Sequence, residues 1–265
     1  MKKYFVIGNP IDHSLSPKLQ NYWIKSNNIS AIYEKKKLND NELENFILKI
    51  KHEEISGINV TVPFKKKVIP FLDQLSLEAK NTQSVNTIYL DNNKLVGHNT
   101  DIEGFELSLK NLKFNLLNKE ILILGAGGVV PSLIFALKKM NVSKITLSNR
   151  SKYKAEDLKK LFNDLKIVDW GKLVNFDMII NATSIGLNKD DKIDLNFSEI
   201  GKNSLFYDVI YNPLETAFLK NGKKMGHSIE NGKMMFIYQA SAAFKIWHKI
   251  EPKINKDVIK LITND

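Results

Sequence analysis

Short apolar runs alternate with longer segments in which apolar residues recur every three or four positions. This alternation predicts strands and helices that follow one another along the chain. In the first hundred residues it predicts strands at 4–8, 31–38, 57–62, 85–90 and 94–98, and helices at 17–27 and 40–50. Asp91-Asn92-Asn93 is typical of a hairpin turn between the last two strands. Ser16, followed by Pro17, is expected to cap the first helix, so this part of the chain is mixed α and β.

A second pattern begins after a predicted helix at 101–112. A strand at 121–124, a glycine-rich turn, a helix to residue 140 and a strand at 144–148 form a βαβ unit, which requires a parallel sheet. Further strands at 178–180 and 205–210 and helices at 232–248 and 256–263 complete the pattern. We therefore predict an α/β protein of two domains. A Rossmann-like, doubly wound nucleotide-binding domain at 102–232 is inserted into an N-terminal α/β domain at 1–101, which residues 233–265 complete.

Composition narrows the possible classes of protein. The 265 residues contain no cysteine, which excludes disulfides and thiolate metal sites, and we expect no metal. No apolar stretch approaches the roughly 20 residues of a membrane span and no signal peptide is evident, so we expect a cytoplasmic protein. The net charge of +10 comes from 39 basic residues, of which only Arg150 is an arginine. Because the lysines are scattered, we expect a solvated surface and no nucleic-acid partner.

The glycine-rich turn follows a strand and precedes a helix. Gly125, Ala126, Gly127, Gly128 and Val129 would let backbone N–H groups approach a pyrophosphate at the start of that helix. Val130 occupies the third small position of the usual pattern, and this departure could move the helix slightly. A merely structural loop is the alternative interpretation.

The end of the following strand indicates which dinucleotide binds. An NAD site commonly carries Asp or Glu there, whereas this chain has Asn149, Arg150 and Ser151, with Lys154 one turn further on. A guanidinium can grip a ribose 2′-phosphate at two points. The pattern therefore favours NADP over NAD, although Arg150 could also be an ordinary surface residue.

Hydroxyl, amide and carboxyl side chains recur at the predicted strand ends of the first domain. Each has a cap or turn explanation, but together they could line a pocket for a small polyhydroxylated ligand. They are Ser14, Ser16, Asn59, Thr61, Asn86 and Asp101.

Many of these segments occur, in the same order, in one known family. They are Gly8-Asn9-Pro10-Ile11, His13 to Pro17, Gly57 to Lys65, Val85-Asn86-Thr87, Asn99-Thr100-Asp101, the glycine turn, Asn149-Arg150-Ser151, Asn181 to Ser184, Asp208 to Pro213, and Asn231-Gly232 with Met235 and Gln239. Over essentially its whole length the chain resembles bacterial shikimate dehydrogenase. Gln20 and Ser84 depart from the family pattern, and Ser84 puts the shape of the substrate loop in doubt.

The resemblance implies reversible NADP-dependent reduction of 3-dehydroshikimate to shikimate. It implies that Lys65 is the catalytic acid and base beside Asp101. The substrate would be held by Ser14, Ser16, Asn59, Thr61, Asn86, Tyr211 and Gln239. The cofactor would be held by Gly125 to Val129, Asn149, Arg150, Ser151, Lys154, Thr183, Val209 and Gly232.

Chemistry favours Lys65 over other candidates, since a positioned cation can stabilise a developing oxyanion and then give it a proton. Lys66 and Lys67 are expected to point elsewhere, and neither His13 nor His98 has an acidic partner at a fixed spacing. Two alternatives stay open: a quinate/shikimate dehydrogenase with broader substrate or NAD use, and a non-catalytic ligand-binding regulator. The regulator would be expected to lack Lys65 or Asp101. The protein is expected to be a monomer or a homodimer.

Overall fold

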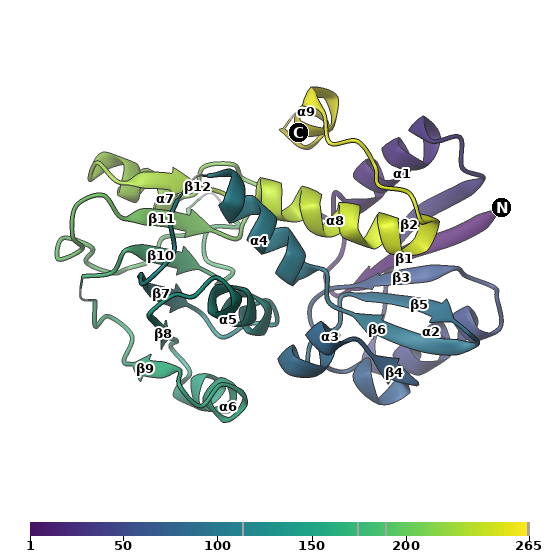
Figure 1. The fold of residues 1–265 in the computed structure, drawn as a ribbon, viewed down its shortest axis with the longest axis horizontal. Coiled ribbons are helices and arrows are strands. Elements are labelled where there is room, and N and C mark those ends of the chain that lie inside the picture. The colour runs from purple at the N-terminus through teal and green to yellow at the C-terminus, as the bar shows by residue number, and fades with distance from the viewer. Residues whose placement is uncertain (113, 174, 189, 264–265) are drawn as a thin grey trace. The chain divides into compact units, whose positions relative to one another are not determined.

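Two units make up the chain. The computed structural model describes residues 1–112, 114–173, 175–188 and 190–263 (Figure 1). Unit 1 joins Met1–Gly104 to Ile237–Asp265, and unit 2 is Phe105–Phe236. Within the predicted closing segment 233–265, residues 264 and 265 lie outside the described residues.

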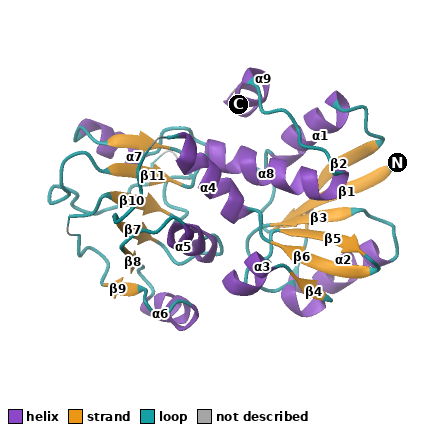
Figure 2. Cartoon of the chain, in the orientation of Figure 1, coloured by secondary structure: helices purple, strands orange, loops and turns teal. Residues whose placement is uncertain are grey.

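Unit 1 contains a mixed six-stranded sheet (Figure 2). Its strands are β1 (Lys2–Gly8), β2 (Ala31–Lys37), β3 (Gly57–Val60), β4 (Gln74–Leu75), β5 (Thr87–Asp91) and β6 (Lys94–His98). Their order is β2-β1-β3-β5-β6-β4, with β1 parallel to both neighbours and β5 antiparallel to β3 and β6. The β5–β6 hairpin turns at Asn92 and Asn93, whose φ angles of 47° and 61° match a type I′ turn. The predicted strands are therefore present, but β3 ends before Thr61.

The helices of unit 1 come from both ends of the chain. They are α1 (Ser16–Ser26), the 3₁₀ turns η1 (Asp40–Glu42) and η2 (Ile69–Phe71), α2 (Leu43–Lys51), α3 (Leu77–Thr82), the start of α4 (Asp101–Asn111), most of α8 (Lys233–His248) and α9 (Lys256–Thr263). Trp247 of α8 packs against Gly57, where a Cβ atom would collide with the indole, and its Nε1 donates to the Ile88 carbonyl at 3.3 Å. The returning helix is thus part of the unit 1 core.

Two local expectations for these helices are wrong. Ser16 does not cap α1: Leu15 is the N-cap residue, no side chain caps the helix, and Ser16 is its first residue. The predicted helix at 40–50 is divided into η1 and α2, and a capping box of Asn39 and Glu42 lies at the start of the 3₁₀ turn. Gln20, which departs from the family pattern, is buried in α1 and donates to the Ala240 carbonyl at 2.9 Å.

Unit 2 contains a six-stranded sheet in which every pairing is parallel. Its strands are β7 (Glu120–Leu124), β8 (Lys144–Ser148), β9 (Lys166–Val168), β10 (Met178–Asn181), β11 (Leu205–Asp208) and β12 (Ser228–Glu230). The order β9-β8-β7-β10-β11-β12 is the doubly wound order of the Rossmann fold, with its topological switch between β7 and β10. The predicted fold class is confirmed.

The helices of unit 2 follow the strands in the way a parallel sheet requires. Wholly within the unit lie α5 (Val130–Lys139), α6 (Lys152–Leu161) and α7 (Ala217–Lys224). Val130 is fully buried at the first position of α5 and Pro131 lies in the first turn, so the larger side chain is accommodated inside the unit. Among the described residues, no helix has both the length and the apolar composition needed to cross a membrane.

Candidate active site

Lys65 is fixed by the turn that follows β3. The Phe64 ring is 1% exposed in the unit 1 core, and the Phe64 N–H donates to the Thr61 carbonyl at 2.9 Å. The Lys65 carbonyl accepts from the Val85 N–H at 2.9 Å, which ties the turn to the segment that precedes β5. The backbone of Lys65 is therefore held on two sides, and its side chain is directed by the fold.

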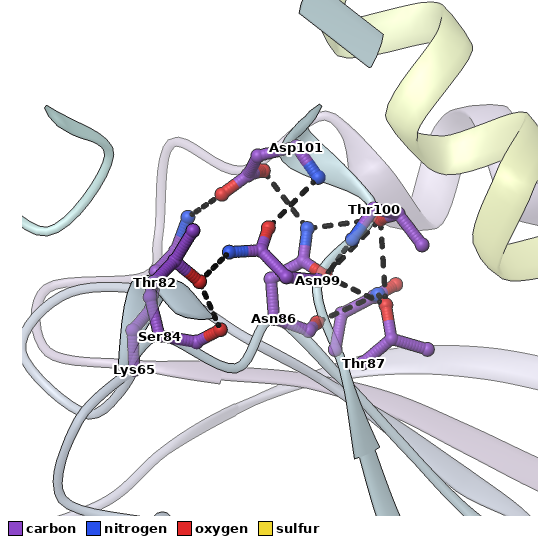
Figure 3. A network of polar contacts seen from close by, with 9 residues as sticks. Lys65, Thr82, Ser84, Asn86, Thr87, Asn99, Thr100 and Asp101 are labelled. Atoms are coloured by element: carbon purple, nitrogen blue, oxygen red, sulfur yellow. Dashed lines mark hydrogen bonds and ion pairs between the residues drawn. The ribbon is translucent and has the colours of Figure 1, made fainter. Parts of the chain in front are cut away.

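The Lys65 ammonium forms an ion pair with Oδ2 of Asp101 at the start of α4 (Figure 3). The two side chains are only 12% and 8% exposed, so this pair differs from a solvated surface salt bridge. Oδ1 of Asp101 accepts from the Asn86 side chain at 2.8 Å, and the Asp101 N–H donates to Asn99 Oδ1 at 3.1 Å. Asp101 is thus fixed by two amides and presents its second oxygen to the lysine.

The three consecutive lysines differ as expected. Lys66 is exposed, and Lys67 pairs with Asp40 at 2.7 Å between side chains that are 46% and 66% exposed. Lys65 alone of the three reaches a nearly buried carboxylate. Of the histidines considered, His98 lies 3.7 Å from Glu78, and burial lowers its pKa, which makes it a poor cation at neutral pH.

Asn86 is the centre of a buried amide and hydroxyl cluster (Figure 3). Its Oδ1 accepts from the N–H and Oγ1 of Thr100, at 2.8 and 3.1 Å, and from Thr87 Oγ1 at 2.9 Å. Asn59 Nδ2 donates to the Asn86 carbonyl at 3.0 Å. The structure therefore brings Asn59, Asn86, Asp101 and Lys65 together in unit 1.

The serines and the threonine lie on segments beside this cluster. The Ser16 N–H donates to Ser14 Oγ at 3.3 Å, at the start of α1. The Thr61 N–H donates to the Ile7 carbonyl at 2.9 Å, and a Cβ atom on Gly8 would lie 2.6 Å from the Thr61 methyl group. Gly8 thus permits the close approach of β1 to the Thr61 turn.

The last two candidate substrate residues lie further along the chain. Tyr211 belongs to unit 2, where its ring stacks on Phe236 with centroids 4.4 Å apart. Gln239 lies half-buried on α8, in the part of that helix that belongs to unit 1.

The glycine turn of unit 2 lies at the switch point of its sheet. Gly125 has a φ of +108°, and a Cβ atom there would lie 2.8 Å from the Ala182 carbonyl oxygen, so a side chain is excluded. At Gly127 the nearest atom to an added Cβ is 3.7 Å away, and both Gly127 and Gly128 are exposed. Ala126 and Val129 are half-buried. A backbone turn that is bare of side chains and opens α5 fits the pyrophosphate of a dinucleotide.

The loop after β8 exposes positive charge. Asn149 Nδ2 donates to the Ser151 carbonyl at 2.8 Å, which closes the loop around the exposed Arg150. Lys154 is exposed on the first turn of α6, with its Nζ 6.0 Å from the ring centre of Tyr153. No acid stands between Ser148 and Glu156. The residues present therefore fit a ribose 2′-phosphate, and a carboxylate for an unphosphorylated ribose is lacking in this segment.

A second buried cluster holds the ends of β10 and β11. Asn181 Oδ1 accepts from the N–H and Oγ1 of Thr183, at 3.1 and 2.7 Å, while its Nδ2 donates to both oxygens of Asp208 at 3.1 Å. Thr216 Oγ1 donates to Asp208 at 2.6 Å. Burial raises the pKa of Asp208 to about 6, although these hydrogen bonds oppose the shift.

Val209 and Gly232 lie next to this cluster. The Val209 N–H donates to the Asn181 carbonyl at 3.0 Å, and the Gly232 N–H donates to the Ile210 carbonyl at 3.0 Å. A Cβ atom on Gly232 would collide with the Val209 carbonyl oxygen. Thr183, Val209 and Gly232 therefore lie at the carboxyl ends of the parallel strands, where doubly wound folds bind their ligands.

Sequence reasoning assigned no role to several residues that build these clusters, although Thr87 and Asp208 belong to the motifs quoted above: Tyr33, Thr82, Thr87, Asp208 and Thr216. Tyr33 is the only fully buried residue of β2, and a buried tyrosine needs a partner for its hydroxyl, which is a usable signal. Thr216 begins α7 as a capping residue, which is a second signal. Their partners lie 26 and 8 residues away, and the sequence pattern does not identify them.

A Rossmann-type unit with a bare glycine turn, joined to a unit that holds a lysine–aspartate pair, defines the class of two-domain nicotinamide-dependent dehydrogenases. Comparison with known proteins identifies the family within this class. Residues 6–88 match the model of the shikimate dehydrogenase substrate binding domain, and residues 106–196 match that of shikimate / quinate 5-dehydrogenase. The chain belongs to the shikimate dehydrogenase family.

Relatives match over the whole chain. The shikimate dehydrogenase (NADP(+)) of Pelagibacter ubique is 60% identical over 263 residues, which cover 99% of each chain. The crystal structure of shikimate dehydrogenase from Aquifex aeolicus has a TM-score of 0.91 at 38% identity, covering 100% of this chain and 98% of that one. The Thermus thermophilus shikimate 5-dehydrogenase, in complex with NADP(H) and shikimate, has a TM-score of 0.89 at 28% identity, covering 99% and 98%.

Proposed function

We propose that the protein catalyses the reversible NADPH-dependent reduction of 3-dehydroshikimate to shikimate, within the biosynthesis of aromatic amino acids. The observation that carries this proposal is the nearly buried Lys65–Asp101 pair, in which Asp101 also accepts a hydrogen bond from the Asn86 side chain. A full-length match to NADP-dependent relatives supports the same activity. A non-catalytic regulator on this scaffold would have no use for a desolvated ammonium–carboxylate pair.

Lys65 acts as the proton donor and acceptor of the reaction. NADPH, when bound, supplies the hydride that reduces the ketone carbon. The Lys65 ammonium stabilises the negative charge that develops on the ketone oxygen and then protonates it, and in the reverse direction the neutral amine takes the hydroxyl proton. Asp101 orients the ammonium, and Asn86 orients Asp101.

Unit 1 would bind the substrate. Ser14, Ser16, Asn59, Thr61, Asn86 and Gln239 would hold its carboxylate and hydroxyls, and the family motif assigns Tyr211 of unit 2 to the same ligand. In unit 1, Asn59 and Asn86 lie beside the Lys65–Asp101 pair, and Ser14 and Ser16 lie at the start of α1, which supports the assignment. These roles follow from the family motifs that the chain carries at the same positions.

Unit 2 would bind NADP. The turn from Gly125 to Val129 receives the pyrophosphate, and the loop from Asn149 to Ser151 with Lys154 receives the adenosine 2′-phosphate, chiefly through Arg150. Thr183, Val209 and Gly232 then lie along the strand ends that would face the nicotinamide. The exposed guanidinium and the lack of a nearby carboxylate support NADP over NAD.

One assay tests the activity and its closest competitor. The absorbance of NADPH is followed with 3-dehydroshikimate and, separately, with 3-dehydroquinate, and each is repeated with NADH. Strong turnover only for 3-dehydroshikimate with NADPH is expected. Comparable turnover of 3-dehydroquinate, or equal use of NADH, would instead indicate a quinate/shikimate dehydrogenase, which the description of the second family model also allows.

We further propose that the protein works in the cytoplasm as a monomer or a homodimer. The lack of cysteine and of a membrane-spanning helix among the described residues supports this location. Light scattering on the eluting protein distinguishes the two assembly states, and a larger oligomer would contradict both.

A further inference from the structure

Two tyrosines lie side by side in the unit 1 sheet. Tyr4 on β1 and Tyr33 on β2 are register partners, and their side chains are 2% and 1% exposed. Both phenol groups are buried, but their hydroxyls face different partners. Tyr4 hydrogen-bonds with Ser56, whereas Tyr33 hydrogen-bonds with Ser16 and Asn59.

The Tyr33 hydroxyl lies between two candidate substrate residues. It donates to Asn59 Oδ1 at 2.7 Å. A phenol carries one proton, so the hydrogen bond between Tyr33 and Ser16 requires Ser16 to be the donor.

The hydrogen bonds continue from Asn59 to the charged pair. Asn59 Nδ2 donates to Thr87 Oγ1 at 3.1 Å, and Thr87 Oγ1 donates to Asn86 Oδ1 at 2.9 Å. Asn86 Nδ2 donates to Asp101 Oδ1 at 2.8 Å. One run of donors and acceptors therefore leads from Ser16 through Tyr33 to Asp101, and all of its members are fully or nearly buried.

We propose that the Tyr33 hydroxyl is a positioning group for the substrate site, because it couples the Ser16 hydroxyl at one end to the Asn59 and Asn86 amides that hold Asp101 at the other. The inference rests on the proposed function, since it assigns Ser16 and Asn86 to the substrate. Tyr33 acts through these residues and does not itself take part in proton transfer. Burial raises its pKa well above the ordinary value, which keeps the phenol protonated and donating.

The first test compares Tyr33→Phe with Tyr4→Phe. Each substitution removes one buried hydroxyl and keeps the ring, in neighbouring strands of the same sheet. Tyr33→Phe leaves Asn59 Oδ1 without its donor and Ser16 without its acceptor, so we expect shikimate to bind about tenfold more weakly to the cofactor-free protein. The KM for shikimate should rise to a similar extent, while kcat falls less than about threefold and the KM for NADP⁺ is unchanged.

Tyr4→Phe is the control for the loss of a buried hydroxyl. It should lower the melting temperature about as much as Tyr33→Phe does, and leave shikimate binding within about twofold of wild type. The double variant Ser16→Ala with Tyr33→Phe should weaken binding by less than the product of the two single effects, because both act on one hydrogen-bonded run. Titration calorimetry and steady-state kinetics provide these values.

Thr87→Val gives a second route to the same conclusion if Tyr33→Phe does not fold. It removes the link from Asn59 to the Asn86 side chain with little change of shape and keeps the hydrogen bond from Asn59 to the Asn86 carbonyl. It should show the same split, with a raised KM for shikimate and an unchanged KM for NADP⁺. If the wild-type enzyme is active and Tyr33→Phe binds shikimate normally, the inference is overturned while the proposed function stands. The same holds for Thr87→Val where it replaces Tyr33→Phe. A wild-type protein that neither binds nor oxidises shikimate would overturn the proposed function, and the inference with it.

Discussion

Each unit contains a buried aspartate that accepts hydrogen bonds from an asparagine side chain, but the remaining side-chain partner of the aspartate differs between the two units. In unit 1, Asn86 donates to one oxygen of Asp101 and Lys65 pairs with the other. In unit 2, Asn181 donates to both oxygens of Asp208, and the Thr216 hydroxyl donates to one of them. An asparagine orients a buried carboxyl group in both.

The chemical type of this remaining partner, Lys65 in unit 1 and Thr216 in unit 2, determines what each carboxyl group can do. A lysine ammonium can exchange a proton with a ligand, so the unit 1 cluster supports chemistry. A threonine hydroxyl at the start of α7 cannot replace it, and the unit 2 cluster instead orders the backbone around Thr183 and Val209. Burial of a carboxyl group therefore does not by itself identify a catalytic site, and the chemistry of its hydrogen-bond partners has to be considered as well.

The largest expected effect is that of Lys65→Ala. Loss of the proton donor should lower kcat by roughly 10²–10⁴-fold with little change in the KM for shikimate, because the ammonium acts mainly in the transition state. Lys66→Ala, which changes an exposed neighbour, is the matched control and should remain near wild type. Steady-state kinetics decide the matter: near-normal turnover of Lys65→Ala, or equal losses in both variants, would remove Lys65 from its role.

The second largest effect is expected in the pH dependence of stability to which Asp208 contributes. The pKa of Asp208 is about 6 in the folded protein, above the ordinary value of 3.8, so the folded state binds its proton more tightly than the unfolded state. Its contribution is present below pH 4 and is lost as pH rises to about 6, an effect of up to about 3 kcal/mol.

Asp208→Asn removes this titration. The difference in unfolding free energy between wild type and Asp208→Asn should therefore shift against wild type from about pH 4 to about pH 6 and then level off. Urea denaturation across this range measures it. A difference that stays constant with pH would show that the pKa of Asp208 is not raised in the folded protein.

The next prediction concerns Arg150, which is expected to make the main contact of unit 2 with the adenosine 2′-phosphate. Arg150→Ala should weaken NADPH by roughly 1.5–3 kcal/mol, the worth of hydrogen bonds to a charged group, and leave NADH almost unchanged. Fluorescence titration with each nucleotide measures both affinities, and Lys160→Ala on the same helix–loop region serves as a control of equal charge. Equal weakening of both nucleotides would contradict the 2′-phosphate assignment.

The smallest effect is expected for Thr216→Val. It removes the donor to Asp208 and the acceptor for the Leu219 N–H, and should cost about 1–2 kcal/mol of unfolding free energy. Shikimate binding to unit 1 should not change, which calorimetry can confirm alongside the denaturation curve. A loss of shikimate affinity would show that the unit 2 cluster has more than a local role.

Elements with a clear apolar pattern could be predicted from the sequence. The strand at 144–148 and the helix at 256–263 have the predicted bounds. The strands β4, β9 and β12 were missed because each has only two or three residues, which are exposed or half-buried and too few to show a periodicity. The sequence pattern gives no bounds for the helix α6, on which only Ala155 is buried and nearly all other positions are exposed.

Candidate residues for the site could be named from local sequence, but not their partners. Lys65 and Asp101 are 36 residues apart, and their contact depends on how β3, the turn and α4 pack together. Tyr33 lies in a strand whose other residues are half-buried or exposed, and its role follows only from the pairing of β2 with β1 and its contact with Asn59. Sequence alone identifies the chemical groups, whereas long-range packing determines which of them meet.

The packing of Trp247 against Gly57 affects the order in which the two units acquire their structure. The indole and its hydrogen bond to Ile88 join β3 and β5 of unit 1 to the part of α8 that follows unit 2 in the sequence. Unit 2 is continuous in sequence and is complete once Phe236 has emerged, whereas unit 1 waits for its closing helices. The sheet of unit 1 therefore stays open until the chain of unit 2 has been made, whereas the nucleotide-binding unit closes on its own residues.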